Sequence, residues 1–256
     1  MKLAKRILPA VLSFACPSFA AEDPPKWDVA EAFGPTTRVD FETAEGTWIN
    51  LDVSPDGTRI VFDLLGDLYL MPVEGTGGAL AERLTSGPAF DMQPRFSPDG
   101  SLIAFASDRD GATNLWVVRP DGTGLRQVSK EKRWFVNSPV WSPDGQYLFA
   151  RHHFVKERSL GAGEIWMYHL GGESGLQVTE KASWQKDAGE PTISPDGRYL
   201  YYSKDVSTGD NFEYNKDPNG AIYAILRRDL LTGEERREVS VQGGAVTPRQ
   251  IGRASL

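Results

Sequence analysis

The chain has very little of the chemistry that usually marks a metal or disulfide protein. It contains one cysteine, Cys16, among 256 residues, which rules out an intrachain disulfide and a multi-cysteine zinc site. Its three histidines are His152, His153 and His169. His152 and His153 are adjacent, so on a strand they point to opposite faces, and no His-x-His pair exists. We therefore predict no metal ion, no cofactor and no catalytic residue in this chain.

Positive charge and long apolar runs are also scarce. The net charge is −7 and the isoelectric point is near 5.1, which argues against nucleic acid as a partner. The N-terminal apolar run, residues 7–14, is too short for a transmembrane helix, which needs about 20 residues. A Gly-x-Ser-x-Gly motif and a Walker-type phosphate loop are both absent from the sequence. These absences argue against the commonest serine-hydrolase and nucleotide-binding sites.

The N-terminus has the order of residues that is typical of a secretory signal peptide. Three basic residues precede the apolar run, and small residues lead to a cleavage point after Ala20. We therefore predict a signal peptide at residues 1–20 and a lead-in segment at residues 21–46. The protein is expected to be exported to the periplasm or secreted by a bacterium, and no cysteine remains after cleavage.

The tetrapeptide Ser-Pro-Asp-Gly occurs four times, and its copies start 43, 45 and 52 residues apart. Periods of about 40–50 residues are typical of propeller blades and of helical solenoids. Proline presets the first corner of a turn and glycine takes the left-handed position that closes it, so each copy should join two antiparallel strands. The predicted turn residues are Asp56, Gly57, Asp99, Gly100, Asp144, Gly145, Asp196 and Gly197.

The segments around each turn decide between the two repeat architectures. Residues 48–53 and 59–63, on either side of the first turn, are rich in β-branched and aromatic residues, as strands are. A third apolar strand and a short polar fourth strand follow in every copy, and no helical period is present. The sequence therefore predicts an all-β propeller of four-stranded antiparallel blades over residues 47–256, with four blades and the start of a fifth.

These repeats resemble the TolB-like propeller repeats of exported bacterial proteins. Four segments, residues 27–29, 48–54, 158–166 and 212–217, are more specifically similar to large exported bacterial amidohydrolases. In that group a TolB-like propeller precedes a metal-dependent hydrolase domain. The resemblance covers roughly residues 27–247 and implies that any divalent metal belongs to the hydrolase domain, outside this chain.

The chain departs from the repeat near its end. In the last three copies a proline stands three residues before the serine of the turn: Pro94, Pro139 and Pro191. The same spacing after Pro248 predicts a fifth Ser-Pro-Asp-Gly at residues 251–254, where the sequence has Ile-Gly-Arg-Ala. This difference suggests a truncated or frame-shifted copy of a longer parent, and hence an incomplete ring. An incomplete ring leaves a blade face uncovered, so we expect the protein to oligomerise or aggregate unless a partner covers that face.

Two loops are longer than a blade requires. Residues 151–163 are basic and residues 205–220 are acidic. Long loops on a rigid scaffold often carry binding sites; alternatively, these two pack on each other or on a further domain through opposite charge. The candidate binding or interdomain residues are Arg151, Arg158, Glu164, Asp210 and Glu213.

The sequence as a whole indicates an exported, non-catalytic propeller module. Its predicted partner is a protein or a downstream hydrolase domain, and the resemblance favours an amidohydrolase parent. Two alternatives remain open at this stage. The chain could be a stand-alone periplasmic envelope protein similar to TolB, or the propeller that gates access to a prolyl-oligopeptidase-like peptidase.

Overall fold

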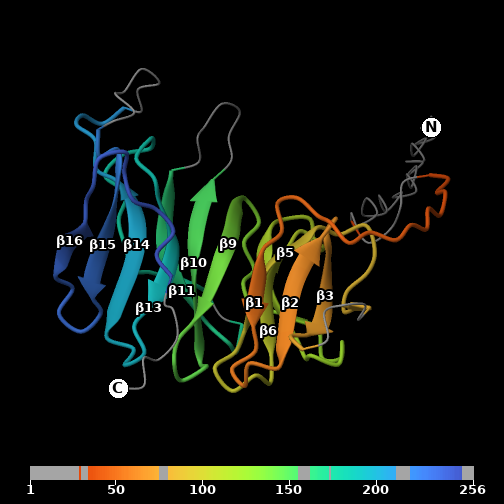
Figure 1. Cartoon of the computed structure of the whole chain (residues 1–256). Coiled ribbons are helices and arrows are strands. Elements are labelled where there is room, and N and C mark those ends of the chain that lie inside the picture. Colours follow the sequence, from red (N-terminus) through yellow and green to blue (C-terminus); the bar gives the residue numbers. More distant parts are fainter. Residues whose placement is uncertain are drawn as a thin grey trace, which may run out of the picture.

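Sixteen β-strands make up the regular structure of the residues that the structure describes. The computed structural model describes residues 29, 34–74, 80–154, 162–172, 174–211 and 220–249. The strands form four antiparallel sheets of four strands each (Figure 1). This arrangement confirms the predicted all-β fold of four-stranded propeller blades. None of the described residues forms a helix long and apolar enough to cross a membrane.

Each sheet, or blade, consists of four strands that are consecutive in the chain. Blade 1 contains β1 (Leu51–Val53), β2 (Arg59–Leu64), β3 (Asp67–Pro72) and β4 (Glu82–Arg83). Blade 2 contains β5 (Asp91–Phe96), β6 (Ile103–Ser107), β7 (Asn114–Val118) and β8 (Arg126–Gln127). Blade 3 contains β9 (Trp134–Trp141), β10 (Tyr147–Phe154), β11 (Gly163–His169) and β12 (Leu176–Gln177). Blade 4 contains β13 (Ala188–Ile193), β14 (Tyr199–Asp205), β15 (Tyr223–Asp229) and β16 (Glu235–Val239).

The first strand of every blade lies on the inside of the arc. Strand β1 contacts β5, β5 contacts β9, and β9 contacts β13, so these four strands surround a common axis. Each blade packs against the blades next to it in the chain. Among the described strands, those of blade 4 make no contact with those of blade 1. The ring is therefore open between its first and fourth blades.

The Ser-Pro-Asp-Gly turns join the first and second strands, as their chemistry predicts. In the first copy Gly57 has a φ of +74° and donates its N–H to the carbonyl of Ser54 at 2.8 Å. The carboxylate of Asp56 accepts bonds from the Ser54 hydroxyl and from the backbone of Thr58, and these bonds lower the pKa of Asp56 to about 2. The same pair of bonds recurs at Asp99, Asp144 and Asp196.

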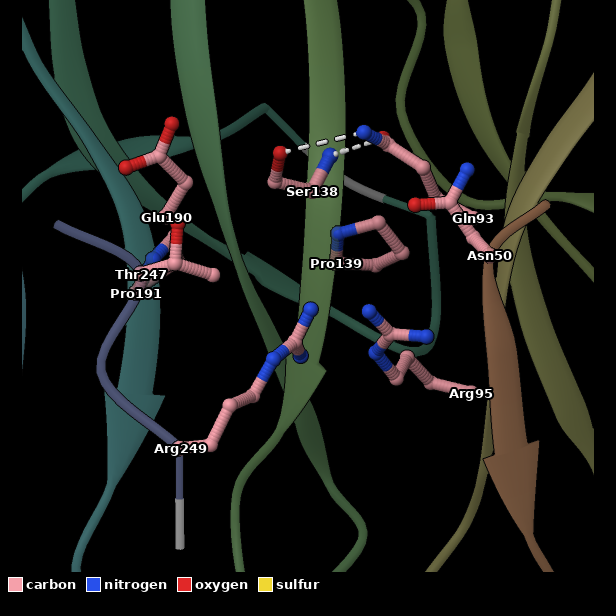
Figure 2. A pocket seen from close by; sticks show the side chains of 9 residues that line it. All are labelled: Asn50, Gln93, Arg95, Ser138, Pro139, Glu190, Pro191, Thr247 and Arg249. Atoms are coloured by element: carbon pink, nitrogen blue, oxygen red, sulfur yellow. Dashed lines mark hydrogen bonds between the residues drawn. The ribbon is translucent and has the colours of Figure 1, made fainter. Parts of the chain in front are cut away.

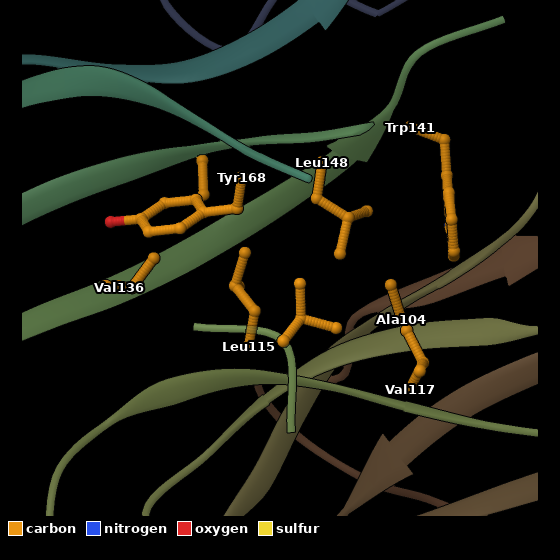
Figure 3. Packing of buried hydrophobic residues seen from close by; sticks show 9 residues of the cluster. Ala104, Leu115, Val117, Val136, Trp141, Leu148 and Tyr168 are labelled. Carbon is orange, nitrogen blue, oxygen red and sulfur yellow. The ribbon is translucent and has the colours of Figure 1, made fainter. Parts of the chain in front are cut away.

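Hydrophobic clusters fill the three interfaces between neighbouring blades. Figure 3 shows the cluster between blades 2 and 3, where Leu115 of β7 lies near Leu148 of β10 and Tyr168 of β11. Each of these side chains is fully buried, and such burial stabilises the fold by about 1.5–3 kcal/mol for a leucine. The face of blade 1 away from blade 2 is different, because Leu51 and Val53 stay 55% and 46% exposed.

Candidate functional site

The structure places Arg151 at the interface between blades 3 and 4. Its guanidinium donates to Oδ1 of Asp187 from Nη2 at 2.8 Å and from Nε at 3.1 Å. The same carboxylate oxygen accepts the backbone N–H of Gly163 at 2.7 Å. Arg151 therefore helps to join β10 to the segment that enters β13.

Glu164 forms its ion pair with Lys181, whereas Arg151 is bonded to Asp187. The carboxylate of Glu164 lies 3.1 Å from the ammonium of Lys181 and accepts a hydrogen bond from the indole of Trp166 at 3.3 Å. In the ladder between β10 and β11, Glu164 lies opposite His152, one register position from Arg151. Period-two alternation points the Arg151 and Glu164 side chains to opposite faces of the blade.

The two long loops are described only in part. Asp210 is exposed, and its backbone carbonyl accepts a hydrogen bond from the hydroxyl of Ser183. Arg158 and Glu213 lie outside the described residues. The predicted binding or interdomain role of these loops, and their packing through opposite charge, stay predictions.

A second, unpredicted feature lies on the innermost strands. In blades 2, 3 and 4 the residue before a proline has a positive φ: 57° at Gln93, 54° at Ser138 and 49° at Glu190. Left-handed backbone is uncommon outside glycine and costs on the order of 1 kcal/mol or more. At each of these sites the pairing with the second strand is interrupted by a register shift. Proline has no N–H to donate to the neighbouring strand, so a β-bulge at each X-Pro pair removes the proline from the hydrogen-bond ladder.

The bulges bring equivalent residues of successive blades to one cavity. In each blade this residue stands four positions before the serine of the Ser-Pro-Asp-Gly turn. After blade 4 the equivalent residue is Thr247, which directly precedes Pro248. In blade 1 a leucine follows the equivalent residue in place of proline, and the pairing of β1 with β2 has no shift. We call this set the channel ring; its members are Asn50, Gln93, Ser138, Glu190 and Thr247.

Hydrogen bonds between blades hold the first half of the channel ring. Asp63 of β2 accepts the backbone N–H of Asn50 at 2.8 Å and the side-chain amide of Asn50 at 3.0 Å. The same carboxylate accepts the N–H of Gln93 at 2.7 Å, which links blade 1 to blade 2. The side chain of Gln93 in turn accepts the N–H of Ser138 at 2.6 Å, which links blade 2 to blade 3.

The second half of the ring is held through one serine. The hydroxyl of Ser203 on β14 donates to Oε2 of Glu190 at 2.6 Å and accepts the N–H of Thr247 at 2.9 Å. Thr247 has a φ of 55°, the same left-handed conformation as the three residues at the blade bulges. The chain after blade 4 thus repeats the start of a blade, in agreement with the predicted start of a fifth.

The ring opens into a cavity of about 230 Å³ that also contains Arg95 and Arg249 (Figure 2). Arg95 is almost fully buried, and its Nη1 donates to the carbonyls of Leu51 at 3.1 Å and Pro94 at 2.6 Å. Burial, and next the charge of Arg249, lower the pKa of Arg95 to about 10. Arg95 is therefore positive at neutral pH, and an anion beside the two guanidinium groups would offset the repulsion between them.

Among the described residues, the cavity is lined by amides, hydroxyls, one carboxylate and two guanidinium groups. Such groups recognise polar and charged ligands. Within the described ranges, no three or more His, Cys, Asp or Glu side chains are grouped so that they could hold a metal ion. The histidines lie elsewhere: His152 stacks between Trp134 and Trp166, at centroid distances of 4.8 and 4.4 Å. The geometry therefore suits binding.

Sequence reasoning missed this cavity, although a signal was present. The prolines three residues before the serine mark the same position in three blades: Pro94, Pro139 and Pro191. The residue before each of these prolines belongs to the channel ring, and the residue after the first of them is Arg95. The sequence pattern alone does not show that these residues face one another across an axis.

The sequence is similar to proteins that contain a propeller of this kind. A model described as the TolB beta propeller domain matches residues 36–226. The curated "Uncharacterized peptidase YuxL" of Bacillus subtilis is 26% identical over 197 residues, which are 62% of this chain and 29% of that protein. The chain thus spans less than a third of that relative.

Solved structures show the same fold at low sequence identity. TolB from Acinetobacter baumannii is 18% identical, with a TM-score of 0.54 over 74% of this chain and 43% of that one. A Mycobacterium tuberculosis puromycin-hydrolyzing peptidase is 13% identical, with a TM-score of 0.54 over 80% of this chain and 30% of that one. At these identities the likeness concerns the fold alone, and both matches cover less than half of the longer chain.

Proposed function

Because this chain belongs to the TolB beta propeller domain family, we propose that it is a non-catalytic recognition module whose channel ring and cavity bind a polar segment of a partner protein or of a neighbouring domain. The observation that carries the proposal is the repeated X-Pro bulge, which turns a polar side chain to the same cavity in successive blades. Left-handed, non-glycine residues are costly, and they are often retained at sites of binding or catalysis.

We propose that the cavity binds a ligand and does not catalyse a reaction. Ser138 is the hydroxyl-bearing member of the ring in blade 3, and its Oγ lies 3.4 Å from the amide Nε2 of Gln93. An amide is not a base, so this pair lacks the activating partner that a nucleophilic serine requires. The remaining polar groups can orient a ligand through hydrogen bonds and charge.

Binding and turnover can be tested on the purified chain. We expect fluorescein-labelled polar octapeptides to bind, with an increase in fluorescence anisotropy, and apolar octapeptides of equal length to bind at least tenfold more weakly. Arg249→Trp fills the cavity from an exposed position and should abolish binding, whereas Arg236→Trp on the outermost strand β16 should not. Turnover of amide, lactam or peptide substrates that depends on added zinc would overturn the non-catalytic assignment.

We further propose that the module belongs to an exported bacterial protein. The charge and size order of residues 1–20 supports export, and so does the family match, since a curated TolB of the Tol-Pal system is 44% identical over 46 residues. Fusion of residues 1–46 to alkaline phosphatase, which is active only after export, should give an active enzyme. An inactive but fully synthesised fusion would contradict export.

The protein that contains the module has two candidate activities. The segments 158–166 and 212–217 resemble exported amidohydrolases, which supports an amidohydrolase. The peptidase relatives support a second candidate, a propeller that controls access to a peptidase domain. The coding sequence of the parent gene distinguishes them, because a His-x-His motif fits the first and a Gly-x-Ser-x-Gly motif fits the second.

A further inference from the structure

The charges of the channel cavity are divided between its two ends. Figure 2 shows the guanidinium groups of Arg95 and Arg249 pointing toward one another, with the carboxylate of Glu190 at the opposite end. The hydroxyl of Ser138 and the amides of Asn50 and Gln93 lie along the wall of the same cavity. A ligand that lies between the ends therefore meets positive charge at one end and negative charge at the other.

The positive end is built into the innermost strands. Arg95 is 9% exposed, and the two carbonyls that accept from its Nη1 hold the guanidinium in place. Within the described residues, neither Arg95 nor Arg249 has a carboxylate within ion-pair distance. The charge of Asp52 acts on both guanidinium groups and that of Asp63 on Arg95, but neither carboxylate forms an ion pair with them. The two guanidinium groups can therefore accept a ligand carboxylate, which takes two or more charge-assisted hydrogen bonds.

The negative end is equally specific. Glu190 lies at the bulge before Pro191, and its carboxylate accepts a hydrogen bond from the Ser203 hydroxyl at 2.6 Å. In the part of the chain that the structure describes, no lysine or arginine pairs with this carboxylate. Glu190 lines the cavity, and a carboxylate at a cavity wall without a cation partner suits an ammonium group.

From this division of charge we propose that the cavity binds a small zwitterion of the amino-acid or dipeptide class. Its carboxylate lies against Arg95 and Arg249, and its ammonium lies against Glu190. The volume of about 230 Å³ is below the roughly 300–1,000 Å³ of pockets for drug-sized ligands, which supports a ligand of this size. The inference rests on the proposed function, since it names the chemical class of the segment or ligand that the same cavity recognises.

Two kinds of molecule carry a carboxylate and an ammonium close together. One is a free dipeptide, and the other is a polypeptide whose last residue is lysine, with its C-terminal carboxylate and side-chain ammonium. Titration calorimetry with glycylglycine and with N-acetyl-glycyl-glycyl-lysine distinguishes them. Stronger binding of glycylglycine assigns the site to free dipeptides, and stronger binding of the lysine peptide assigns it to chain ends. Either result supports a zwitterionic ligand.

Capped probes test the charges themselves. N-acetylglycylglycine lacks the ammonium and glycylglycinamide lacks the carboxylate, so each should bind roughly tenfold or more weakly than glycylglycine. The same comparison applies to the lysine peptide, with acetylated lysine or a C-terminal amide in place of the free groups. Equal binding of capped and free probes would overturn the inference.

Single substitutions assign each charge to a side chain. Arg249→Ala should remove the preference for a free carboxylate, and Glu190→Gln should remove the preference for a free ammonium while it keeps an acceptor for Ser203. Arg236→Ala, at an exposed arginine of β16, should leave both preferences unchanged. If neither Arg249→Ala nor Glu190→Gln alters the preferences, the charges of this cavity do not select the ligand.

Octapeptide binding and zwitterion binding can be lost separately, which distinguishes the two proposals. If polar octapeptides bind in an Arg249-dependent manner but no zwitterionic probe does, the recognition function stands and the zwitterion is wrong. If neither octapeptides nor zwitterions bind to a chain that unfolds cooperatively, both are wrong.

Discussion

The side-chain oxygen Oε1 of Gln93 accepts the backbone N–H of Ser138 at 2.6 Å, although the two residues are 45 positions apart. They occupy the same position in successive blades, and each has a left-handed backbone. The N–H of Gln93 is bonded in turn to Asp63 of blade 1. A chain of hydrogen bonds therefore links three successive blades, in addition to the hydrophobic clusters between them.

Removal of this acceptor should destabilise the fold. Gln93→Ala leaves the half-buried N–H of Ser138 without its partner, and we expect a loss of about 1–3 kcal/mol in the free energy of unfolding, measured by urea denaturation. Gln146→Ala, in an exposed turn, serves as the control and should change the free energy by less than about 0.5 kcal/mol. Equal effects of the two substitutions would show that the bond between blades contributes nothing.

A second left-handed residue is a site where the chain can be stabilised. Leu65 and Gly66 form the two-residue turn between β2 and β3, with φ values of 54° and 88°. Positive φ at both positions is the type I′ geometry, which favours Asn-Gly, and the Leu65 side chain is 75% exposed. Leu65→Asn should raise the free energy of unfolding by about 0.5–1 kcal/mol.

A matched exposed leucine provides the control for this substitution. Leu231, in the turn between β15 and β16, is 84% exposed and has no positive φ. Leu231→Asn should give no comparable gain in thermal stability. A lower melting temperature for Leu65→Asn than for the unchanged chain would contradict the role assigned to the left-handed turn.

The blades could be predicted from the sequence because their signals are local. Ser-Pro-Asp-Gly defines its own turn through three neighbouring groups, as the bonds of Asp56 to Ser54 and Thr58 show. Alternating apolar residues on either side then determine which face of each strand is buried. Neither feature requires knowledge of residues far along the chain.

The channel ring could not be predicted in the same way. Gln93, Ser138 and Glu190 have ordinary residue types for exposed loops, and the proline that follows each of them does not by itself reveal its left-handed conformation. Their partners are set by the arrangement of blades around an axis. The partner of Arg151 could not be predicted for the same reason, because Asp187 lies at the start of the next blade.

A buried histidine should make stability depend on pH below neutrality. Burial, followed by the nearby charges of Arg151 and His152, lowers the pKa of His153 from 6.5 to about 3. The unfolded chain therefore binds a proton near pH 6.5 that the folded chain does not bind until about pH 3. Stability from this group is complete above pH 6.5 and falls as the pH decreases toward 3, by up to about 1.4 kcal/mol per pH unit.

Replacement of the histidine isolates its contribution. His153→Gln cannot gain a proton, so a plot of unfolding free energy against pH should be flatter for this variant between pH 6.5 and pH 4. His169→Gln, at an exposed position at the end of β11, should keep the slope of the unchanged chain. Parallel curves for the His153 variant and the unchanged chain would contradict the neutral, buried state of His153.

The uncovered face of blade 1 should promote self-association. Leu51 and Val53 are exposed on the innermost strand β1, and blade 4 does not cover them. We expect light scattering after size exclusion to show oligomers, and Leu51→Glu to shift them toward monomer because a charge opposes burial of this face. Leu125→Glu, at a 42% exposed leucine outside the face, is the control. A sharp monomer peak with cooperative melting for the unchanged chain would contradict the prediction.

The charged residues that sequence reasoning grouped as one surface should behave as two independent pairs. Arg151 is bonded to Asp187 across the blade interface, whereas Glu164 is bonded to Lys181, and the two pairs share no partner among these four side chains. Double-mutant cycles by urea denaturation should therefore give a coupling energy above about 0.5 kcal/mol for Arg151→Ala with Asp187→Ala. The coupling of Arg151→Ala with Glu164→Ala should stay within about 0.5 kcal/mol. A larger coupling between Arg151 and Glu164 would mean that the two residues act together, as a single interdomain surface requires.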